Sequence, residues 1–285
     1  AWQKKAGVKA LGLHEHGGRM VFVGSNSAVA AGNTPVNDIL QLERYRSIDS
    51  TILNCAQISP EELQAIGELL MNYNEPAKTI SVLAWIAGCF IKEHLRTRDV
   101  KFPHLMLIGE AGSGKSTTVE RVVLPVFSRT KIIAAGQVTA FTLMKDSASS
   151  NLIPQALDEF KPSKIDRIRL DTLYNHFRNN YDGHEGVRGR ADQSVVSYEL
   201  LAPLIVAGEE SADEAAIRER SIELLFSKKD LKSAEHRSSF QSLSASATVL
   251  GSLGRTLLET ALQTKPEEAY GWHQEGLLCF ARELP

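Results

Sequence analysis

The sequence has few cysteines, and their arrangement suggests no structural role for them. Cys55, Cys89 and Cys279 are its only thiols. Because they are odd in number and far apart, we expect neither a disulfide framework nor a cysteine-based metal site. This composition favours a reducing compartment, so we expect the protein to be cytoplasmic.

Long apolar runs and a charge excess are also missing. The longest apolar run, residues 80–91, is interrupted by Ser81 and is shorter than the about 20 residues that span a bilayer. We therefore expect a buried helix there and no membrane partner. Lysine and arginine total 32 against 34 aspartates and glutamates, a formal net charge of −2. Because this balance creates no general field that attracts nucleic acid, any DNA contact has to come from a local patch.

The hydrophobic pattern divides the chain into four regions. We predict a small β-rich region over 1–57, with strands at 20–23 and 50–55, and a helical region over 58–100 that starts at Ser59-Pro60. An alternation of strands and helices over 101–225 predicts an α/β core with a central, mostly parallel sheet flanked by helices. Its apolar strands are expected at 105–108, 132–134, 153–157 and 204–207. Beyond about residue 214, and through the C-terminal region 226–285, we expect mainly helix.

A phosphate-binding motif follows the first strand of the core. The run Gly109 to Thr117 reads GEAGSGKST and matches G-x-x-x-x-G-K-[ST]. Such a loop curls so that its N–H groups face phosphate oxygens, and the next helix adds its positive end. The sequence therefore predicts a P-loop NTPase that binds ATP or GTP, with ATP and Mg²⁺ as the expected cofactors. The predicted nucleotide ligands are Gly109, Gly112, Ser113, Gly114, Lys115, Ser116 and Thr117.

Two adjacent acids follow a later strand. Asp158 and Glu159 come directly after the predicted strand 153–157. A nucleotide hydrolase needs one acid near Mg²⁺ and gains from a second that orients the attacking water. We expect Ser116 and Asp158 to be metal ligands and Glu159 to polarise the water. Lys115 also belongs to the predicted catalytic set, because it places a charge at the β and γ phosphates.

Other polar side chains are candidates for phosphate sensing and for a contact between subunits. Glu209 follows the strand at 204–207, where it could sense the γ-phosphate, and Arg255 is a second candidate phosphate contact. Arg220, the first choice, and Arg218, the second, lie beyond what we predict to be the last strand. An arginine there could act as a finger that reaches the nucleotide site of a neighbouring subunit.

A basic, glycine-rich segment lies between the acid pair and residue 204. We predict a mobile loop over 183–190, in which Arg188 and Arg190 could contact a DNA backbone. Acids such as Asp182 and Glu185 are interleaved with these cations, so an ordinary solvated loop is the alternative interpretation.

Together, Gly109–Thr117, Leu157–Phe160 and Ala216–Arg220 resemble ring-forming, AAA-like P-loop ATPases. More narrowly, the layout is similar to the helicase portion of primase–helicase proteins of phages and mobile elements. One departure lies at Gly208-Glu209-Glu210, where such helicases commonly carry Asn or Thr. The resemblance implies a homo-oligomeric ring and a DNA partner, and we expect the chain to be a piece of a longer polypeptide.

Three functions are compatible with these motifs. The first is an ATP-driven motor on DNA, most simply a ring helicase or translocase that acts in replication, with single-stranded DNA as the expected partner. The second is an assembly or switch ATPase that is gated by ATP and acts on a protein partner without nucleic acid. The third is a kinase, which Glu159 argues against because a kinase gains nothing from an activated water.

Overall fold

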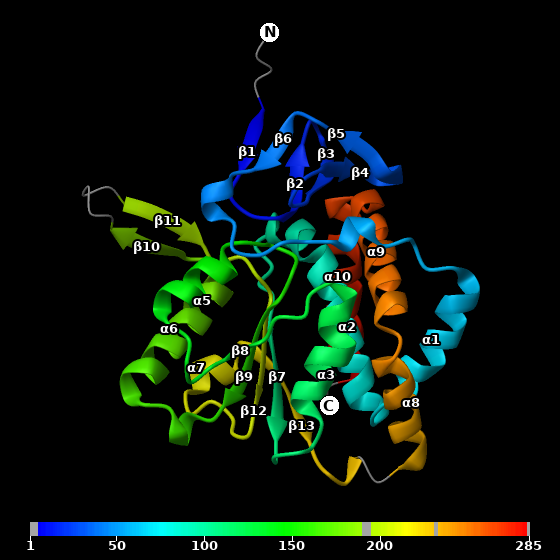
Figure 1. The fold of residues 1–285 in the computed structure, drawn as a ribbon, viewed down its shortest axis with the longest axis vertical. Coiled ribbons are helices and arrows are strands. Elements are labelled where there is room, and N and C mark those ends of the chain that lie inside the picture. The colour runs from blue at the N-terminus through cyan, green and yellow to red at the C-terminus, as the bar shows by residue number, and fades with distance from the viewer. Residues whose placement is uncertain (1–4, 190–194, 231–232, 284–285) are drawn as a thin grey trace.

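A five-stranded, fully parallel sheet forms the centre of the molecule (Figure 1). The computed structural model describes residues 5–189, 195–230 and 233–283. The strand order is β13-β7-β12-β9-β8, and the α/β fold class expected from the sequence is confirmed. The strands are β7 (His104–Gly109), β8 (Ile133–Ala134), β9 (Gln155–Phe160), β12 (Leu204–Gly208) and β13 (Ser221–Phe226).

The apolar runs of the central strands are explained by burial on both faces. Leu105 and Leu107 belong to one core, whereas Met106 and Ile108 belong to a second core on the opposite face. This follows from the alternation of side chains along a strand. Figure 1 shows helices α5 and α6 on one side of the sheet and α1, α2, α8 and α9 on the other.

The helices give each face of the sheet its cover. On the first side lie α5 (Ala140–Ser147), α6 (Arg167–Asp182) and the short α7 (Ala215–Arg218). The other side carries α1 (Pro60–Asn72), α2 (Pro76–Arg96), α3 (Lys115–Thr118), α4 (Leu124–Val126), α8 (Ala234–Ser244), α9 (Ala247–Gln263) and α10 (Pro266–Glu283). A π-helical turn over Val119–Val123 joins α3 to α4, where Pro125 has no N–H to continue the regular ladder.

The predicted start of the helical region is confirmed in detail. The Ser59 hydroxyl accepts a hydrogen bond from the Glu62 N–H at 3.2 Å, and the Glu62 carboxylate accepts one from the Ser59 N–H at 2.9 Å. This reciprocal arrangement satisfies two free donors at the start of α1. None of the described helices is both long enough and apolar enough to cross a bilayer.

A small antiparallel sheet precedes the helices. It consists of β2 (Gly12–His16), β3 (Arg19–Val23), β4 (Ala28–Ala30) and β5 (Thr34–Val36), and beside it β1 (Ala6–Val8) pairs with β6 (Ile39–Gln41). The strand predicted at 20–23 is confirmed as β3. The strand predicted at 50–55 is wrong, because Ile52–Asn54 forms one 3₁₀ turn in which the Cys55 N–H bonds back to the Ile52 carbonyl.

Three other strands differ from the sequence prediction. The strand predicted at 153–157 is shifted to β9, so Asp158 and Glu159 lie within its last residues. The predicted helical stretch after 214 instead contains β13, an edge strand in which Glu223 and exposed Leu225 break the apolar pattern. The predicted loop over 183–190 contains a hairpin strand, β10 (Glu185–Gly189), which pairs with β11 (Val195–Glu199). Its tip, residues 190–194, is outside the described part.

A buried polar loop joins the N-terminal sheet to the core. Asn151, only 1% exposed, acts as a substitute strand partner for β2. Its side-chain oxygen accepts from the Leu13 N–H at 2.9 Å, and its side-chain amide donates to the Leu13 carbonyl at 2.6 Å. The Leu11 N–H donates to the Ser149 carbonyl at 2.8 Å. These contacts satisfy backbone groups that are otherwise shielded from water.

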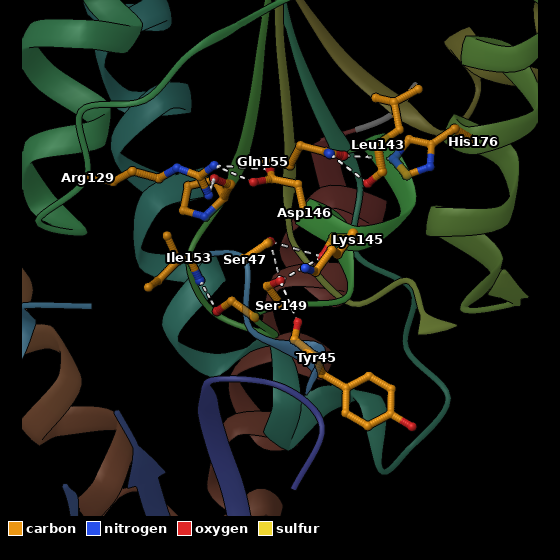
Figure 2. A network of polar contacts seen from close by, with 12 residues as sticks. Tyr45, Ser47, Arg129, Leu143, Lys145, Asp146, Ser149, Ile153, Gln155 and His176 are labelled. Atoms are coloured by element: carbon orange, nitrogen blue, oxygen red, sulfur yellow. Dashed lines mark hydrogen bonds and ion pairs between the residues drawn. The ribbon is translucent and has the colours of Figure 1, made fainter. Parts of the chain in front are cut away.

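The same loop anchors the start of β9. Figure 2 shows Arg129 paired with Asp146 and Gln155 placed between Leu143 and His176. The ion pair is buried at 2.9 Å, and Arg129 also donates to the Pro154 carbonyl at 2.9 Å. The Gln155 amide donates to the Leu143 carbonyl at 3.0 Å. The strand that carries the acid pair is therefore fixed to α5 and α6 by side-chain contacts.

Two buried histidines are neutral, one at the start of β7 and one in α6. His104 lies within hydrogen-bond distance of the Phe177 carbonyl, at 2.9 Å, and His176 of the Gln155 side-chain oxygen, at 2.7 Å. Burial, which penalises the charged ring, lowers the pKa of His104 to about 4 and that of His176 to about 3. Both rings are therefore donors without charge near neutral pH.

We expect the protein to lose stability between pH 7 and pH 5. An unfolded histidine has a pKa of about 6.5, so protons bind the unfolded chain first and pull it from the folded state. The stabilising effect is complete above about pH 6.5 and falls with decreasing pH, by about 2 kcal/mol per histidine at pH 5. Melting temperatures across this range measure it. His176→Gln should flatten the pH dependence, whereas His184→Gln, at an exposed position, should not. An unchanged slope in His176→Gln contradicts the prediction.

Candidate nucleotide site

The phosphate loop connects β7 to α3 at the carboxyl edge of the sheet. Gly109 ends β7 so close to the edge strand β13 that a Cβ atom would lie 1.9 Å from the Phe226 carbonyl oxygen. Gly114 precedes α3 with φ of 90°, a conformation that side chains with a Cβ rarely adopt. The loop thus has the backbone that the motif requires, and it ends at the positive end of a helical segment.

Lys115 is folded into this loop. Its ammonium donates to the Glu110 carbonyl at 2.8 Å and to the Ser113 hydroxyl at 3.2 Å. Burial lowers the pKa of Lys115, while the carboxylates of Glu209, Asp158 and Glu110 act in the opposite direction. The ammonium is therefore held by neutral oxygens, beside a surplus of negative charge.

The structure brings Ser116 and Asp158 together across the site. The Ser116 hydroxyl donates to an Asp158 carboxylate oxygen at 2.8 Å, although 42 residues separate them. A hydroxyl beside a carboxylate suits Mg²⁺, which prefers oxygen ligands and is usually held by one or two carboxylates together with substrate phosphates. Over the described ranges, no three acidic, histidine or cysteine side chains gather to form a complete cage for a metal. The donor set therefore fits a metal that arrives with a nucleotide.

Glu159 has an unusual backbone at the end of β9. It is exposed and has a φ of 57°, in the left-handed region. The pairing of β9 with β12 shifts register at this point, between Val206 and Gly208. Such irregularities redirect side chains and are costly for a residue other than glycine. Because the Glu159 N–H donates to the Asp158 carboxylate at 2.8 Å, the two acids share one local structure but face different surroundings.

Glu209 lies beside this pair, at the end of β12. Its N–H donates to the Phe160 carbonyl at 3.0 Å, and its carboxylate pairs with the Lys161 ammonium. The Lys161 hydrogen bond lowers the pKa of Glu209. The side chain is thus within the site, as proposed from the sequence, and it is an anion that is neutralised by a neighbouring lysine.

The predicted arginines lie away from this edge. Arg220 precedes β13, and its carbonyl accepts from the N–H of His104, the first residue of β7. The phosphate loop is at the other end of that strand, about 17 Å away at 3.3 Å per residue. The Arg220 side chain pairs with Asp182 at 3.7 Å. Arg218 is exposed and donates to the Ala212 carbonyl at 3.1 Å. Arg220 therefore cannot reach the nucleotide site of its own chain.

Arg255 also lies apart from the phosphate loop, in the sequence and in its contacts. Arg255 is 3% exposed in α9, where it pairs with Glu259 at 3.4 Å and contacts Asn33. A residue committed in this way is not brought to a phosphate. Arg188 lies on β10 opposite Val196, and Arg190 is outside the described residues.

A cleft and an apolar cavity adjoin the phosphate loop. The cleft, of about 420 Å³, is lined by the loop, the acid pair, Lys161 and Glu209. The cavity, of about 300 Å³, lies against the loop and includes Tyr73, Asn74, Arg237 and Phe240 in its walls. None of these four residues is predicted from the sequence, because they come from α8 and the α1–α2 connection and match no motif.

Two lysines of the site were also missed. Lys161 follows the acid pair by two positions, a proximity that could have indicated it. Lys228 comes after β13, and its N–H donates to the Glu110 carboxylate at 2.9 Å. Its ammonium lies 3.8 Å from the same carboxylate. No local signal in the sequence connects Lys228 with a loop that lies more than 100 residues earlier.

Comparisons with known proteins give a distant likeness. No protein-family model and no curated protein matches the chain. Among solved structures, the apo C-terminal region of NrS-1 is similar over 90% of this chain and 57% of its own, with 13% identity and a TM-score of 0.49. JCV helicase with a bound acetamide compound is similar over 77% of this chain and 62% of its own, with 14% identity and a TM-score of 0.43. The chain spans less than two thirds of either structure, and its function has to be inferred from its own site.

We expect Glu159→Gln to bind ATP normally but to hydrolyse it about 10²–10⁴-fold more slowly. The amide keeps the shape of the side chain and loses the base, whose loss typically has an effect of this size. Single-turnover hydrolysis and equilibrium binding measure the two parts separately. Lys115→Ala is the contrasting control, because it should lose tight binding itself. Wild-type turnover in Glu159→Gln would move the catalytic role to another residue.

Proposed function

We propose that this chain is the ATPase core of an ATP-driven motor, a ring-forming DNA helicase or translocase that acts in the replication of a phage or mobile element. The observation that carries the proposal is the contact between Ser116 and Asp158 at the end of the phosphate loop, with Glu159 next to it. A loop for phosphates, an oxygen pair for Mg²⁺ and a free acid for water are the parts that nucleotide hydrolysis needs.

In the proposed hydrolysis, the two acids of the pair have different roles. Asp158 accepts a hydrogen bond from Ser116, and we assign it the role of a metal ligand, whereas Glu159 is exposed at the cleft. In the proposed reaction, Glu159 accepts a proton from the water that attacks the γ-phosphate, while Lys115 stabilises the charge that develops on the phosphate oxygens. Bound Mg²⁺ would supply further neutralisation of that charge.

The β10–β11 hairpin is the proposed DNA contact. Figure 1 shows it extending from the body of the molecule. Its base is firmly held: the Tyr198 ring packs edge-on against Tyr45 with centroids 5.9 Å apart, and Glu199 pairs with Lys9 at 3.1 Å. A hairpin with a packed base whose sequence carries arginines can follow a phosphate backbone. Exposed Val187 and Val195 on the same hairpin favour the second candidate, an assembly or switch ATPase with a protein partner.

Single-stranded DNA distinguishes these two functions. The motor should hydrolyse ATP faster when DNA is added, and replacement of both Arg188 and Arg190 by alanine should remove the stimulation. The double variant should also lower the slope of log affinity against log salt by roughly 1.4 per contacting subunit, since each phosphate contact on a single strand contributes about 0.7. Fluorescence anisotropy across a salt series measures the slope.

The control for the hairpin variant is Arg98→Ala, an exposed arginine outside the hairpin that pairs with Glu267. It should leave both the slope and the stimulation unchanged. ATP hydrolysis that does not respond to DNA, together with an unchanged slope in the double variant, would favour the protein-partner ATPase.

The ring is proposed because Arg220, the candidate finger, lies far from the phosphate loop of its own chain. Arg220 lies at the opposite edge of the sheet, with its side chain 27% exposed, so it could serve only the site of another subunit. An arginine finger supplied across an interface raises turnover by about 10³–10⁵-fold. The Arg220 guanidinium pairs with Asp182 and lies 5.4 Å from the centroid of the Tyr181 ring, and these contacts hold it at the surface.

Mixing Arg220→Ala with Lys115→Ala subunits tests this arrangement. Each variant alone should be inactive, and mixtures should regain part of the activity at interfaces that combine an intact arginine with an intact phosphate loop. Sedimentation establishes that both variants still assemble, and melting curves exclude damage from the lost Asp182 pair. Mixtures that assemble and stay inactive, or full activity in a monomer, would rule out a role of Arg220 between subunits.

A further inference from the structure

The apolar cavity beside the phosphate loop is built from three separate parts of the chain. It takes up about 300 Å³ between the α1–α2 connection, the loop with its helix, and α8. Its lining residues include Tyr73, Asn74, Gly112, Phe240 and Gln241. Because Gly112 also lines the phosphate cleft, a molecule whose phosphates lie in the cleft can place its other end here.

Tyr73 has a polar group that the protein itself does not use. The residue is 1% exposed, and its ring lies 6.4 Å from that of Phe240, centroid to centroid. Its hydroxyl has no hydrogen-bond partner among the described residues. A buried hydroxyl without a partner lowers the stability of the folded protein. Burial also raises the pKa of Tyr73, so the group remains a neutral donor and acceptor.

Asn74 contributes a second polar side chain to the cavity wall. The residue is 3% exposed, and its amide oxygen accepts a hydrogen bond from the Glu75 N–H at 2.8 Å. With that oxygen engaged, the side chain offers the cavity an N–H donor. The buried wall therefore combines aromatic faces with one donor from Asn74 and one hydroxyl from Tyr73.

We propose that this cavity takes the base of the bound nucleotide and that Tyr73 and Asn74 select adenine. The Tyr73 hydroxyl accepts a hydrogen bond from the exocyclic amino group, and the Asn74 amide donates to a ring nitrogen. The inference rests on the proposed function, because it needs a nucleoside triphosphate on the phosphate loop. The base is a flat ring with a polar edge, which matches two aromatic side chains with polar groups beside them.

Guanine fits this wall less well. It presents two adjacent donors, on N1 and N2, and needs acceptors opposite both. No carboxylate is among the described residues that line the cavity, and the buried amide oxygen of Asn74 is already engaged. Gln241 could supply an oxygen, but it is exposed and in competition with water. A site that leaves ligand donors unpaired discriminates against that ligand.

The test measures equilibrium binding of ATP, GTP and purine riboside triphosphate, which is ATP without its amino group. The wild type should bind ATP about fivefold more tightly than the amine-free analogue, the typical effect of one neutral hydrogen bond. Tyr73→Phe should bind ATP about fivefold more weakly and no longer distinguish the two. Its melting temperature without nucleotide should stay the same or rise, because the unpaired hydroxyl is gone. Tyr270→Phe, on α10, is the matched control and should behave as the wild type.

A second variant reverses the donor pattern. Asn74→Asp keeps an oxygen for the Glu75 N–H and replaces the free N–H donor by an acceptor, so it should shift the preference from ATP towards GTP. An ATP affinity that Tyr73→Phe leaves unchanged, or discrimination against the analogue that persists in it, would overturn the assignment of Tyr73. If the wild type binds no nucleotide, and Lys115→Ala behaves identically, the proposed function fails together with this inference.

Discussion

The parallel pairing of β7, β12 and β9 is the constraint on which the rest of the molecule depends. Gly208 lies opposite Ile108, and Val206 opposite Leu157, so three strands far apart in the sequence end at the same edge. The phosphate loop and Glu209 follow two of these ends, and the acid pair lies within the last residues of the third strand. Because parallel strands require crossovers that return the chain to the other edge, His104 and Arg220 necessarily lie on the opposite side.

At the carboxyl edge, the protein's own oxygens hold the cations that a nucleotide would need. Lys115 donates to the Glu110 carbonyl, Lys161 pairs with Glu209, and Lys228 lies near the Glu110 carboxylate. Each of these three lysines therefore has an oxygen partner within the protein. These pairs lower the free-energy cost of gathering charged side chains at this edge, since an unpaired charge in a partly buried place is strongly unfavourable. The surrounding carboxylates also leave room for a divalent cation to balance the site.

The N-terminal sheet and the hairpin are attached to the same part of the core. Asn151 pairs with β2, while Tyr45 and Lys9 hold the base of the hairpin. A few residues after Asn151, Gln155 begins β9, which carries Asp158 and Glu159. The hairpin proposed for DNA is therefore held by the N-terminal region, which is itself fixed to the segment that precedes β9. The fixed start of β9 also explains how the strained backbone of Glu159 is maintained.

The sequence by itself determined the phosphate loop, its strand and its helix, because these depend on local backbone chemistry: glycines at Gly109 and Gly114, and an apolar run before them. It also indicated Asp158 and Glu159 as a pair. Only the tertiary structure showed β13 and the hairpin strands, whose patterns are mixed because one is an edge strand and the others are largely exposed. Only the fold brought Tyr73, Asn74, Lys228 and Phe240 to the loop, because contacts between residues more than 30 positions apart depend on how helices cross the sheet. The fold also decided the role of Arg255. Its charge would suit a phosphate, but the packing of α9 pairs it with Glu259.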